Sequence, residues 1–313
     1  MASTYTEIPV NIDRIEPFIE YNICRIKELF FSSERVYFYD ACSFQRHASF
    51  KDKEQKSLLD YYKNHSSVIV IIRCILMELA SDRHVLAEEY VRFLEALNNT
   101  GVKILLFDEE YTESILSECF SGRTVKNGYL SWAVKMIKSP QSAVVLSLQN
   151  NNEKLLNDIL NGDALSKAEL FQKLFSVLRN NKKHDDDLGE ELIALCVDML
   201  SHLPGIKDGK ICVITDDKPA AIKIDSARRK SNSQNRGSKV ALFSTPKLIQ
   251  HMYEEGLVTN VEDMTNMLKV GTSGTVAVMG ITSNDFSVNS KISMECRELA
   301  NLIKEPNGIR IVF

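Results

Sequence analysis

The chain has 313 residues, 44% of them hydrophobic and 26% charged, and its formal net charge at pH 7 is −4. This composition is that of a globular protein and excludes extensive disorder. The longest apolar run, VIVIIRCILM from residue 68, contains an arginine and is too short to cross a bilayer, and the amino terminus lacks a secretion-signal pattern. Scattered cysteines indicate a reducing compartment, and the histidines lack zinc-type spacing. We therefore expect a cytoplasmic protein without a membrane segment.

Five short apolar runs have the length and composition of buried strands. They are VYFYD, VIVII, VKILLFD, ICVITDD and KVALFS, at residues 36–40, 68–72, 102–108, 211–217 and 239–244. Stretches with helical spacing lie between them. In residues 86–101 the apolar side chains share one face, and Gly101 suits the left-handed position that follows a helix. The alternation predicts a three-layer α/β/α fold with a mainly parallel central sheet.

The same alternation suggests how the chain is divided. We expect residues 36–256 to form the main domain, interrupted by a polar, helical insertion at about 121–185. Residues 1–35 are expected to be an N-terminal helical extension, and residues 257–313 a small C-terminal α/β lobe. The last strand of that lobe has two possible places, the edge of the main sheet or a sheet of its own.

Three local signals predict boundaries within these units. The tetrapeptide SKAE at 166–169 is typical of a capping box and predicts the start of the helix LFQKLFSVL. Thr245, Pro246 and Gly256 predict the cap, the first position and the end of a helix. The polar tract at 228–239 has the lowest complexity in the chain and predicts a mobile loop.

Acidic side chains gather where the predicted strands end. Asp40 ends the first strand, Glu78 lies in the helix after the second, and the fourth runs into two aspartates. In a parallel sheet they would converge on the carboxyl edge, where open α/β proteins bind ligands. A helix before the fourth strand begins with further acids. The full set is Asp40, Glu78, Asp187, Glu190, Glu191, Asp216 and Asp217.

Each acid taken alone also has a structural explanation. Helix starts favour acids through their free N–H groups and the helix dipole, which accounts for Asp40 and for the cluster at 185–191. Glu78 has Arg73 and Arg83 as candidate surface partners. Capping gives no reason, however, for the acids to share one end of a sheet.

The chemistry of such a cluster favours a bound cation. Unpaired carboxylates raise one another's pKa unless a cation lies among them. Oxygen ligands without nearby histidine or cysteine favour Mg²⁺ or Mn²⁺. Such an ion polarises a phosphoryl group and activates water. The sequence therefore predicts phosphodiester hydrolysis.

In their order along the chain, these motifs resemble the PIN domain, a metal-dependent ribonuclease fold. VYFYDAC is similar to its opening strand, ILMELAS to its second acidic motif, VITDD to its Thr-x-Asp motif, and VALFSTPKLIQHM to its last strand and helix. The resemblance covers about residues 36–256. It implies that Asp40, Glu78 and Asp217 hold the metal and that Thr215 assists them.

The third acid of the family pattern lies on a helix, three positions before an Ile-Ala pair. In GEELIALCVDM this position is Glu190, ahead of Ile193 and Ala194, so a glutamate stands where the family usually has aspartate. The insertion separates Glu78 from Glu190 by 112 positions. Neighbouring acids are candidate additional metal ligands. They are Asp187, Glu191 and Asp216.

A basic segment follows the last acid. Residues 218–239 contain seven basic residues and one acid. Such a segment is either a solvated helix end or a contact for nucleic-acid phosphates, and its place after the acids favours the second interpretation. The predicted nucleic-acid contacts are Lys218, Lys223, Arg228, Arg229, Lys230 and Arg236.

The resemblance implies an endonuclease that uses Mg²⁺ or Mn²⁺ to cut RNA, with single-stranded DNA as the less favoured substrate. The size of the chain suggests a protein partner or inhibitor and allows an oligomer, as in a toxin or defence system or in RNA processing. One alternative is a PIN-shaped scaffold or RNA-binding subunit without chemistry, but acids at all four positions favour activity. A phosphatase with Asp40 as nucleophile would need an Asp-x-Asp opening, and Cys42 stands at its second position.

Overall fold

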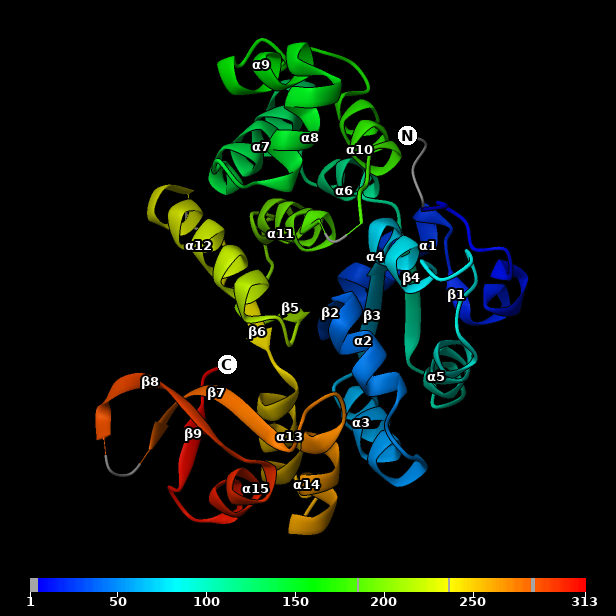
Figure 1. Ribbon diagram of the computed structural model, residues 1–313. Helices are drawn as coiled ribbons and strands as arrows, with labels where there is room; N and C mark the ends of the chain where they lie inside the picture. Colours follow the sequence, from blue (N-terminus) through cyan, green and yellow to red (C-terminus); the bar gives the residue numbers. More distant parts are fainter. Residues whose placement is uncertain (1–4, 185, 236, 283–284) are drawn as a thin grey trace.

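The computed structural model describes residues 5–184, 186–235, 237–282 and 285–313. Its central sheet has six parallel strands in the order β1-β4-β3-β2-β5-β6 (Figure 1). Helices cover both faces, which confirms the predicted three-layer α/β/α fold. The strands are β1 (Ile19–Glu20), β2 (Arg35–Tyr39), β3 (Ser67–Ile72), β4 (Lys103–Phe107), β5 (Ile211–Ile214) and β6 (Ala241–Phe243).

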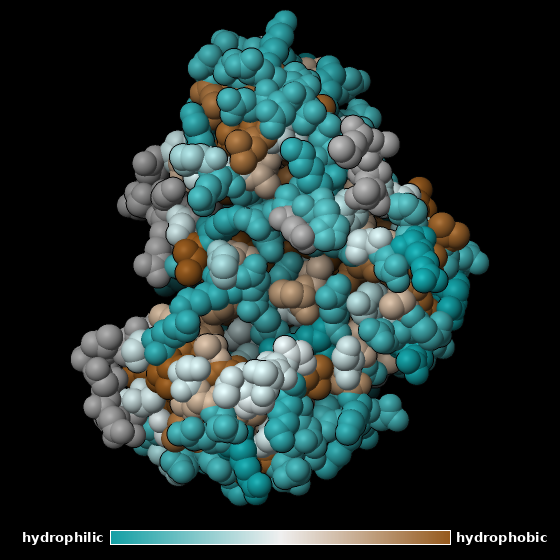
Figure 2. Space-filling model, viewed as in Figure 1, coloured by the Kyte–Doolittle hydropathy of each residue, from teal (hydrophilic) through white to brown (hydrophobic). Residues whose placement is uncertain are grey.

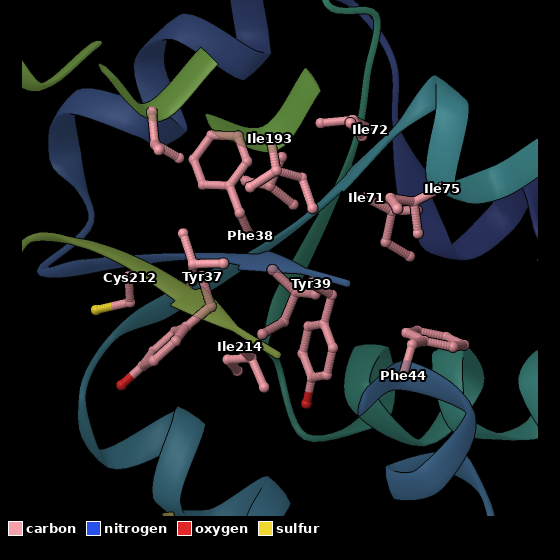
Figure 3. Packing of buried hydrophobic residues seen from close by; sticks show 14 of the residues in the cluster. Tyr37, Phe38, Tyr39, Phe44, Ile71, Ile72, Ile75, Ile193, Cys212 and Ile214 are labelled. Carbon is pink, nitrogen blue, oxygen red and sulfur yellow. The ribbon is translucent and has the colours of Figure 1, made fainter. Parts of the chain in front are cut away.

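The middle strands are apolar because both of their faces are covered. Every residue of β3 and β5 is buried. Successive side chains of β2 point to opposite faces, so Tyr37 and Tyr39 lie on one side and Phe38 on the other (Figure 3). Burying one large apolar side chain contributes about 1.5–3 kcal/mol. The buried sheet therefore fixes the positions of the segments that follow its strands at the carboxyl edge.

The two helical layers pack on these alternating side chains. Phe44 and Tyr62, which lie on two of the helices, contact the strand tyrosines, whereas on the opposite face Phe38 contacts Phe107 of the sheet itself. The tyrosine side is covered by α2 (Ala41–Ala48), α3 (Asp52–Asn64), α5 (Glu88–Asn99) and α13 (Thr245–Glu254). The other side is covered by α1 (Ile23–Ser32), α6 (Tyr111–Leu116) and α11 (Leu188–Ser201), and α4 (Arg73–Leu79) contacts both α2 and α11.

The chain before the main domain contributes an edge strand as well as helices. Two short 3-10 helices, Ile12–Arg14 and Glu16–Phe18, lead into β1, which pairs with β4 and was not predicted. No helix among the described residues is long and apolar enough to span a membrane.

The insertion forms a helical cap over α11. Its helices lie at the top of Figure 1 and are α7 (Arg123–Ile137), α8 (Ala143–Asn151), α9 (Glu153–Asn161) and α10 (Leu170–Asn180). Residues 191–201 of α11 are all buried. This explains why the sequence of α11 is apolar around most of its circumference. The insertion covers a helix that the sheet alone would leave half exposed.

Three of the local predictions need correction. Glu169 has φ of 56° and makes no side-chain cap to α10, so SKAE is not a capping box. The N-cap of α13 is Ser244, not Thr245, although Pro246 lies in the first turn and Gly256 has the expected positive φ. The tract at 228–239 is not a loop throughout, because α12 (Lys218–Asn235) continues to residue 235. Its Ser, Asn and Gln residues carry only small helix penalties.

The C-terminal lobe has its own sheet. It contains α14 (Val261–Lys269), β7 (Thr275–Thr282), β8 (Asp285–Glu295), α15 (Cys296–Lys304) and β9 (Ile309–Ile311), with antiparallel strands in the order β8-β7-β9. The last strand therefore pairs within the lobe and not with the main sheet. Gln250 of α13 donates to the carbonyl of Ile309 and accepts from the N–H of Ile311, which ties β9 to the main domain.

Candidate functional site

Asp40 lies at the carboxyl end of β2 and caps helix α2. Its Oδ1 accepts a hydrogen bond from the backbone N–H of Ala41 at 2.7 Å. Its Oδ2 accepts from Cys42 Sγ at 2.8 Å and from Thr215 Oγ1 at 2.9 Å. Burial raises the pKa of Asp40, and these donors oppose the rise. The residue is thus a helix cap that also presents a carboxylate at the sheet edge.

Thr215 connects the ends of β2 and β5. Its hydroxyl donates to Asp40, and its oxygen accepts from the backbone N–H of Asp217 at 3.0 Å. Tyr39 and Ile214 are register partners, so the two strands end side by side. After β2 the next strand of the sheet along the chain is β3, and after β5 it is β6. These two strands lie on opposite flanks of the β2–β5 pair, so the chain connections run in opposite directions along the sheet. This is the switch point at which open α/β proteins bind ligands.

Glu78 reaches the same region from α4. A Cβ added to Gly189 would lie 2.5 Å from Glu78 Oε1, so the start of α11 contacts this carboxylate directly. The ammonium of Lys182, which follows the last helix of the insertion, pairs with Glu78 at 2.8 Å and with Asp186 at 2.6 Å. Burial raises the pKa of Glu78 to about 7; Lys182 opposes this effect and Asp40 adds to it.

Glu190 has the least favourable electrostatic surroundings. Burial and, to a smaller extent, the charges of Asp40, Glu78, Asp187 and Asp217 together raise its pKa to about 9. These acids come from four separate parts of the chain and are close enough to influence one another. The carboxyl edge of the sheet therefore holds a concentration of negative charge that the fold only partly compensates.

These residues suit a hard cation by their donor chemistry. Carboxylate oxygens are the ligands that Mg²⁺ and Mn²⁺ prefer, and the unfavourable charge around Glu190 is what a divalent ion would relieve. Within the described part of the chain, however, no three acidic, histidine or cysteine side chains lie close enough together to hold a metal ion. Metal binding would require the carboxylates to approach one another.

Asp216 is turned away from the other acids. It accepts hydrogen bonds from the N–H and hydroxyl of Thr245 at 2.7 and 2.5 Å, and it pairs with Arg46 at 3.3 Å. Burial alone would raise the pKa of Asp216, but Arg46, His47 and Thr245 hold it below its usual value. Its contacts are those of a residue that fixes the start of α13.

Glu191 is directed into the insertion, unlike its neighbour Glu190. Its Oε2 accepts hydrogen bonds from Ser142 Oγ at 2.7 Å and from the N–H of Val144 at 2.9 Å, which caps α8. Asp187 stands at the rim, about half exposed, and pairs with Lys223. The sequence could not assign different roles to Asp187, Glu190 and Glu191, because the directions in which their side chains point depend on contacts with the insertion.

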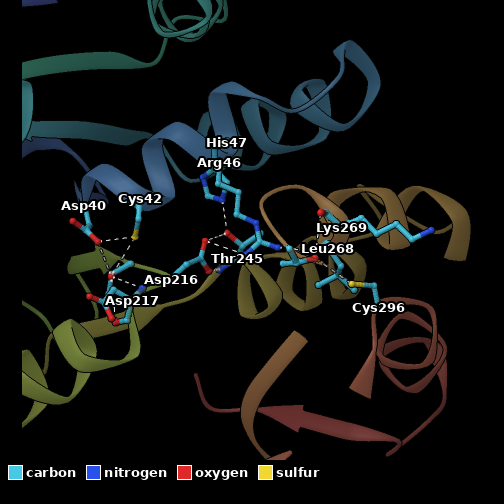
Figure 4. A network of polar contacts seen from close by, with 12 residues as sticks. Asp40, Cys42, Arg46, His47, Asp216, Asp217, Thr245, Leu268, Lys269 and Cys296 are labelled. Carbon is cyan, nitrogen blue, oxygen red and sulfur yellow. Dashed lines mark hydrogen bonds and ion pairs between the residues drawn. The ribbon is translucent and has the colours of Figure 1, made fainter. Parts of the chain in front are cut away.

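A buried hydrogen-bonded chain leads from Asp216 through Thr245 to His47 (Figure 4) and from His47 into the tyrosine layer. Ionised Asp216 only accepts, so Thr245 donates to it and accepts from Nε2–H of His47 at 2.8 Å. His47 Nδ1 then accepts from the Tyr39 hydroxyl at 2.7 Å, and Tyr39 accepts from Tyr62 at 2.5 Å. One tautomer of His47 therefore satisfies every member.

The predicted nucleic-acid contacts fall into three groups. Lys223 is engaged, since it pairs with Asp187 and lies 3.6 Å from Glu191. Lys218 begins α12 next to Asp217 and has no ion pair among the described residues. The remaining positions are Arg228, Arg229 and Lys230, on the helical backbone of α12, and Arg236, outside the described residues.

Two residues at the site were not predicted as site residues. Cys42 donates to Asp40, and its position two residues after that acid was the available signal. Desolvation and the Asp40 charge raise the pKa of Cys42, which keeps it a thiol. Lys182 neutralises Glu78, but it lies in a polar connection without any motif.

Comparison of the chain with protein-family models, with curated proteins and with solved structures finds no match.

Proposed function

We propose that this chain is a PIN-like nuclease that hydrolyses phosphodiester bonds of RNA, and less readily of single-stranded DNA, with Mg²⁺ or Mn²⁺. The observation that carries the proposal is the mutual electrostatic effect among Asp40, Glu78, Glu190 and Asp217 at the switch point of the sheet. Uncompensated carboxylates cost stability, and a fold retains them where they serve a ligand. The order of the motifs along the chain supports the same interpretation.

The proposed roles follow from the contacts of each residue. Asp40, Glu78, Glu190 and Asp217 would hold the cation, which when bound would polarise the phosphodiester and lower the pKa of water. Thr215 holds Asp40 and the backbone of Asp217 in a common orientation through its two hydrogen bonds.

Lys182 keeps part of the site charge balanced. Its side chain is 1% exposed and pairs with Glu78, so this carboxylate is partly neutralised by the protein itself. Cys42 serves Asp40 in a smaller way, by donating a hydrogen bond. Both contacts make the concentration of carboxylates tolerable without a cation.

A catalytically silent scaffold or RNA-binding subunit is the second candidate. It would share the fold and the basic residues, but it would have no need for carboxylates at all four positions. The burial and the neighbouring acids that oppose the ionisation of Glu190 therefore favour the enzyme.

The proposal is tested by incubating end-labelled RNA and single-stranded DNA with the protein and Mg²⁺ or Mn²⁺. RNA should be cleaved faster than single-stranded DNA, and chelation of the metal should abolish cleavage of both. Asp40→Asn and Asp217→Asn should each reduce the rate by on the order of 100-fold. Asp163→Asn, an exposed aspartate in the insertion, is the matched control and should cleave like the wild type. Equal cleavage by all four proteins, or none by any of them, would overturn the proposal.

A further inference from the structure

The C-terminal lobe forms one wall of a groove beside the carboxylates. The groove has a volume of about 370 Å³ and runs between Arg46, Asp216 and Ser244 of the main domain and the open face of β7 and β8. Figure 2 shows the surface hollowed between α12 and this lobe. Asp216 lies between Thr215 and Asp217 in the chain, so the groove begins next to the candidate site.

The charged side chains of this groove favour an anion. Arg46, Lys218 and Lys291 line it against a single acidic side chain, that of Asp216. Arg46 already neutralises that acid, and neither lysine has an ion pair among the described residues. Two positive charges therefore face the groove without a counter-ion from the described part of the chain.

Two of the side chains that line this groove contain a buried polar atom without a partner in the described structure. The Arg46 side chain is 9% exposed; it binds Asp216 and the carbonyl of Leu268, but its Nε has no hydrogen-bond partner within the described structure. Ser244 is 4% exposed, and its hydroxyl is likewise unpartnered. Unsatisfied buried donors are costly, and both of these belong to side chains that border the groove.

An apolar hollow continues from the groove. It has a volume of about 490 Å³, shares Lys218, Met279 and Phe313 with the groove, and is bordered by Ile222, which is 55% exposed. Basic residues beside an aromatic ring and apolar side chains are the combination with which proteins bind single-stranded nucleic acid, phosphates on the cations and bases on the rings.

We propose that this groove between α2, the start of α13 and the β7–β8 face binds the sugar-phosphate backbone of a single strand as it leaves the carboxylate site. Lys218 and Lys291 contact phosphates, and Phe313 stacks with a base. The inference rests on the proposed nuclease function and adds a path for the substrate. It also assigns the C-terminal lobe a role as one wall of that path.

The test measures binding without cleavage. Fluorescence anisotropy with labelled single strands of about 12 nucleotides, in the presence of a chelator, compares RNA, DNA and duplex RNA. The wild type should bind both single strands more tightly than the duplex. Lys291→Glu should weaken binding at least tenfold and lower the salt slope of log K by about 0.7 for each lost phosphate contact. Phe313→Ala should weaken binding by about 5-fold or more.

The control is Lys304→Glu, the same charge reversal at an exposed position of α15 in the same lobe, which should bind within twofold of the wild type. The inference would be overturned if both groove variants bound the single strands as tightly as the wild type does. It would also be overturned if the protein preferred the duplex or bound no strand at all. The chelator prevents cleavage, so this assay measures binding alone. If single strands bind in the groove but are not cut in the separate assay with Mg²⁺ or Mn²⁺, only the nuclease proposal is refuted. A protein that cuts RNA but is unaffected by the groove variants would refute only the groove.

Discussion

Gly189 controls the space beside Glu78. A Cβ at this position would lie 2.5 Å from Glu78 Oε1 and 2.8 Å from Ile75 Cδ1, both closer than side chains tolerate. Gly189→Ala should therefore displace Glu78, reduce cleavage by tenfold or more, and lower the free energy of unfolding by about 1–3 kcal/mol. Cleavage rates and denaturant unfolding measure the two effects.

The matched control for this substitution is Gly128→Ala in the middle of α7. A Cβ there meets nothing within 4 Å, so the variant should cleave normally and gain about 0.5–1 kcal/mol from the better helix former. If Gly189→Ala behaves like Gly128→Ala, the Glu78 carboxylate does not need its observed position.

His47 makes the stability of the fold depend on pH. Burial lowers its pKa to about 3; Asp216 opposes this effect and Arg46 adds to it. The unfolded chain, with a histidine pKa near 6.5, then binds more protons than the folded protein, so stability is full above that pH and falls as the pH drops toward 3.

This dependence is checked with His47→Gln. Between pH 6.5 and about 5, the wild type should lose on the order of 1–2 kcal/mol more unfolding free energy than the variant. Urea unfolding at a series of pH values, followed by circular dichroism, measures the difference. Parallel pH profiles for both proteins would show that His47 is not held neutral by the fold.

The first turn of α11 shows how one element can serve two purposes. Glu190 faces the acids, whereas Glu191 caps α8 of the insertion. Glu190→Ala should abolish cleavage without lowering the melting temperature, because it removes a desolvated and repelled carboxyl group. Glu191→Ala leaves Ser142 and the N–H of Val144 without their acceptor and should cost about 1–3 kcal/mol, with cleavage per folded molecule retained. Thermal melts and cleavage rates of the two variants test these expectations. If Glu190→Ala lost stability and Glu191→Ala lost cleavage, the assignment of Glu190 to the site and of Glu191 to the cap of α8 would be wrong.

The elements of the main sheet could be predicted well from the sequence, because buried parallel strands are short and uniformly apolar. The predicted runs at 36–40 and 68–72 differ from β2 and β3 by one residue at their ends. β1 could not be found, since two residues, Ile19 and Glu20, have no periodicity. The helical tract after residue 228 was missed because low complexity is compatible with a long helix as well as with a loop.

The candidate site could be predicted only as far as the ends of the strands fix it. Asp40, Thr215 and Asp217 follow adjacent strands, so their proximity follows from the sheet order. The different facing of Glu190 and Glu191 depends on contacts with the insertion, as does the position of Lys182. These contacts join segments far apart in sequence, and no local pattern encodes them.

At the scale of the whole molecule, three parts meet around one edge of the sheet. The central sheet supplies Asp40 and Asp217, the insertion covers the helix that carries Glu190, and the C-terminal lobe closes a basic groove beside them. Arg46 links two of these parts, since it bonds both Asp216 and the carbonyl at the end of α14. The added segments thus surround the carboxylates and do not extend away from them.

The central claim is that these carboxylates bind a divalent cation, and titration with Mn²⁺ followed by electron paramagnetic resonance tests it most directly. The wild type should bind Mn²⁺ competitively with Mg²⁺, and Asp40→Asn and Asp217→Asn should each weaken binding by roughly 10–100-fold, while Asp163→Asn leaves it unchanged. Equal Mn²⁺ affinity in all four proteins, or no binding by the wild type, would contradict the claim.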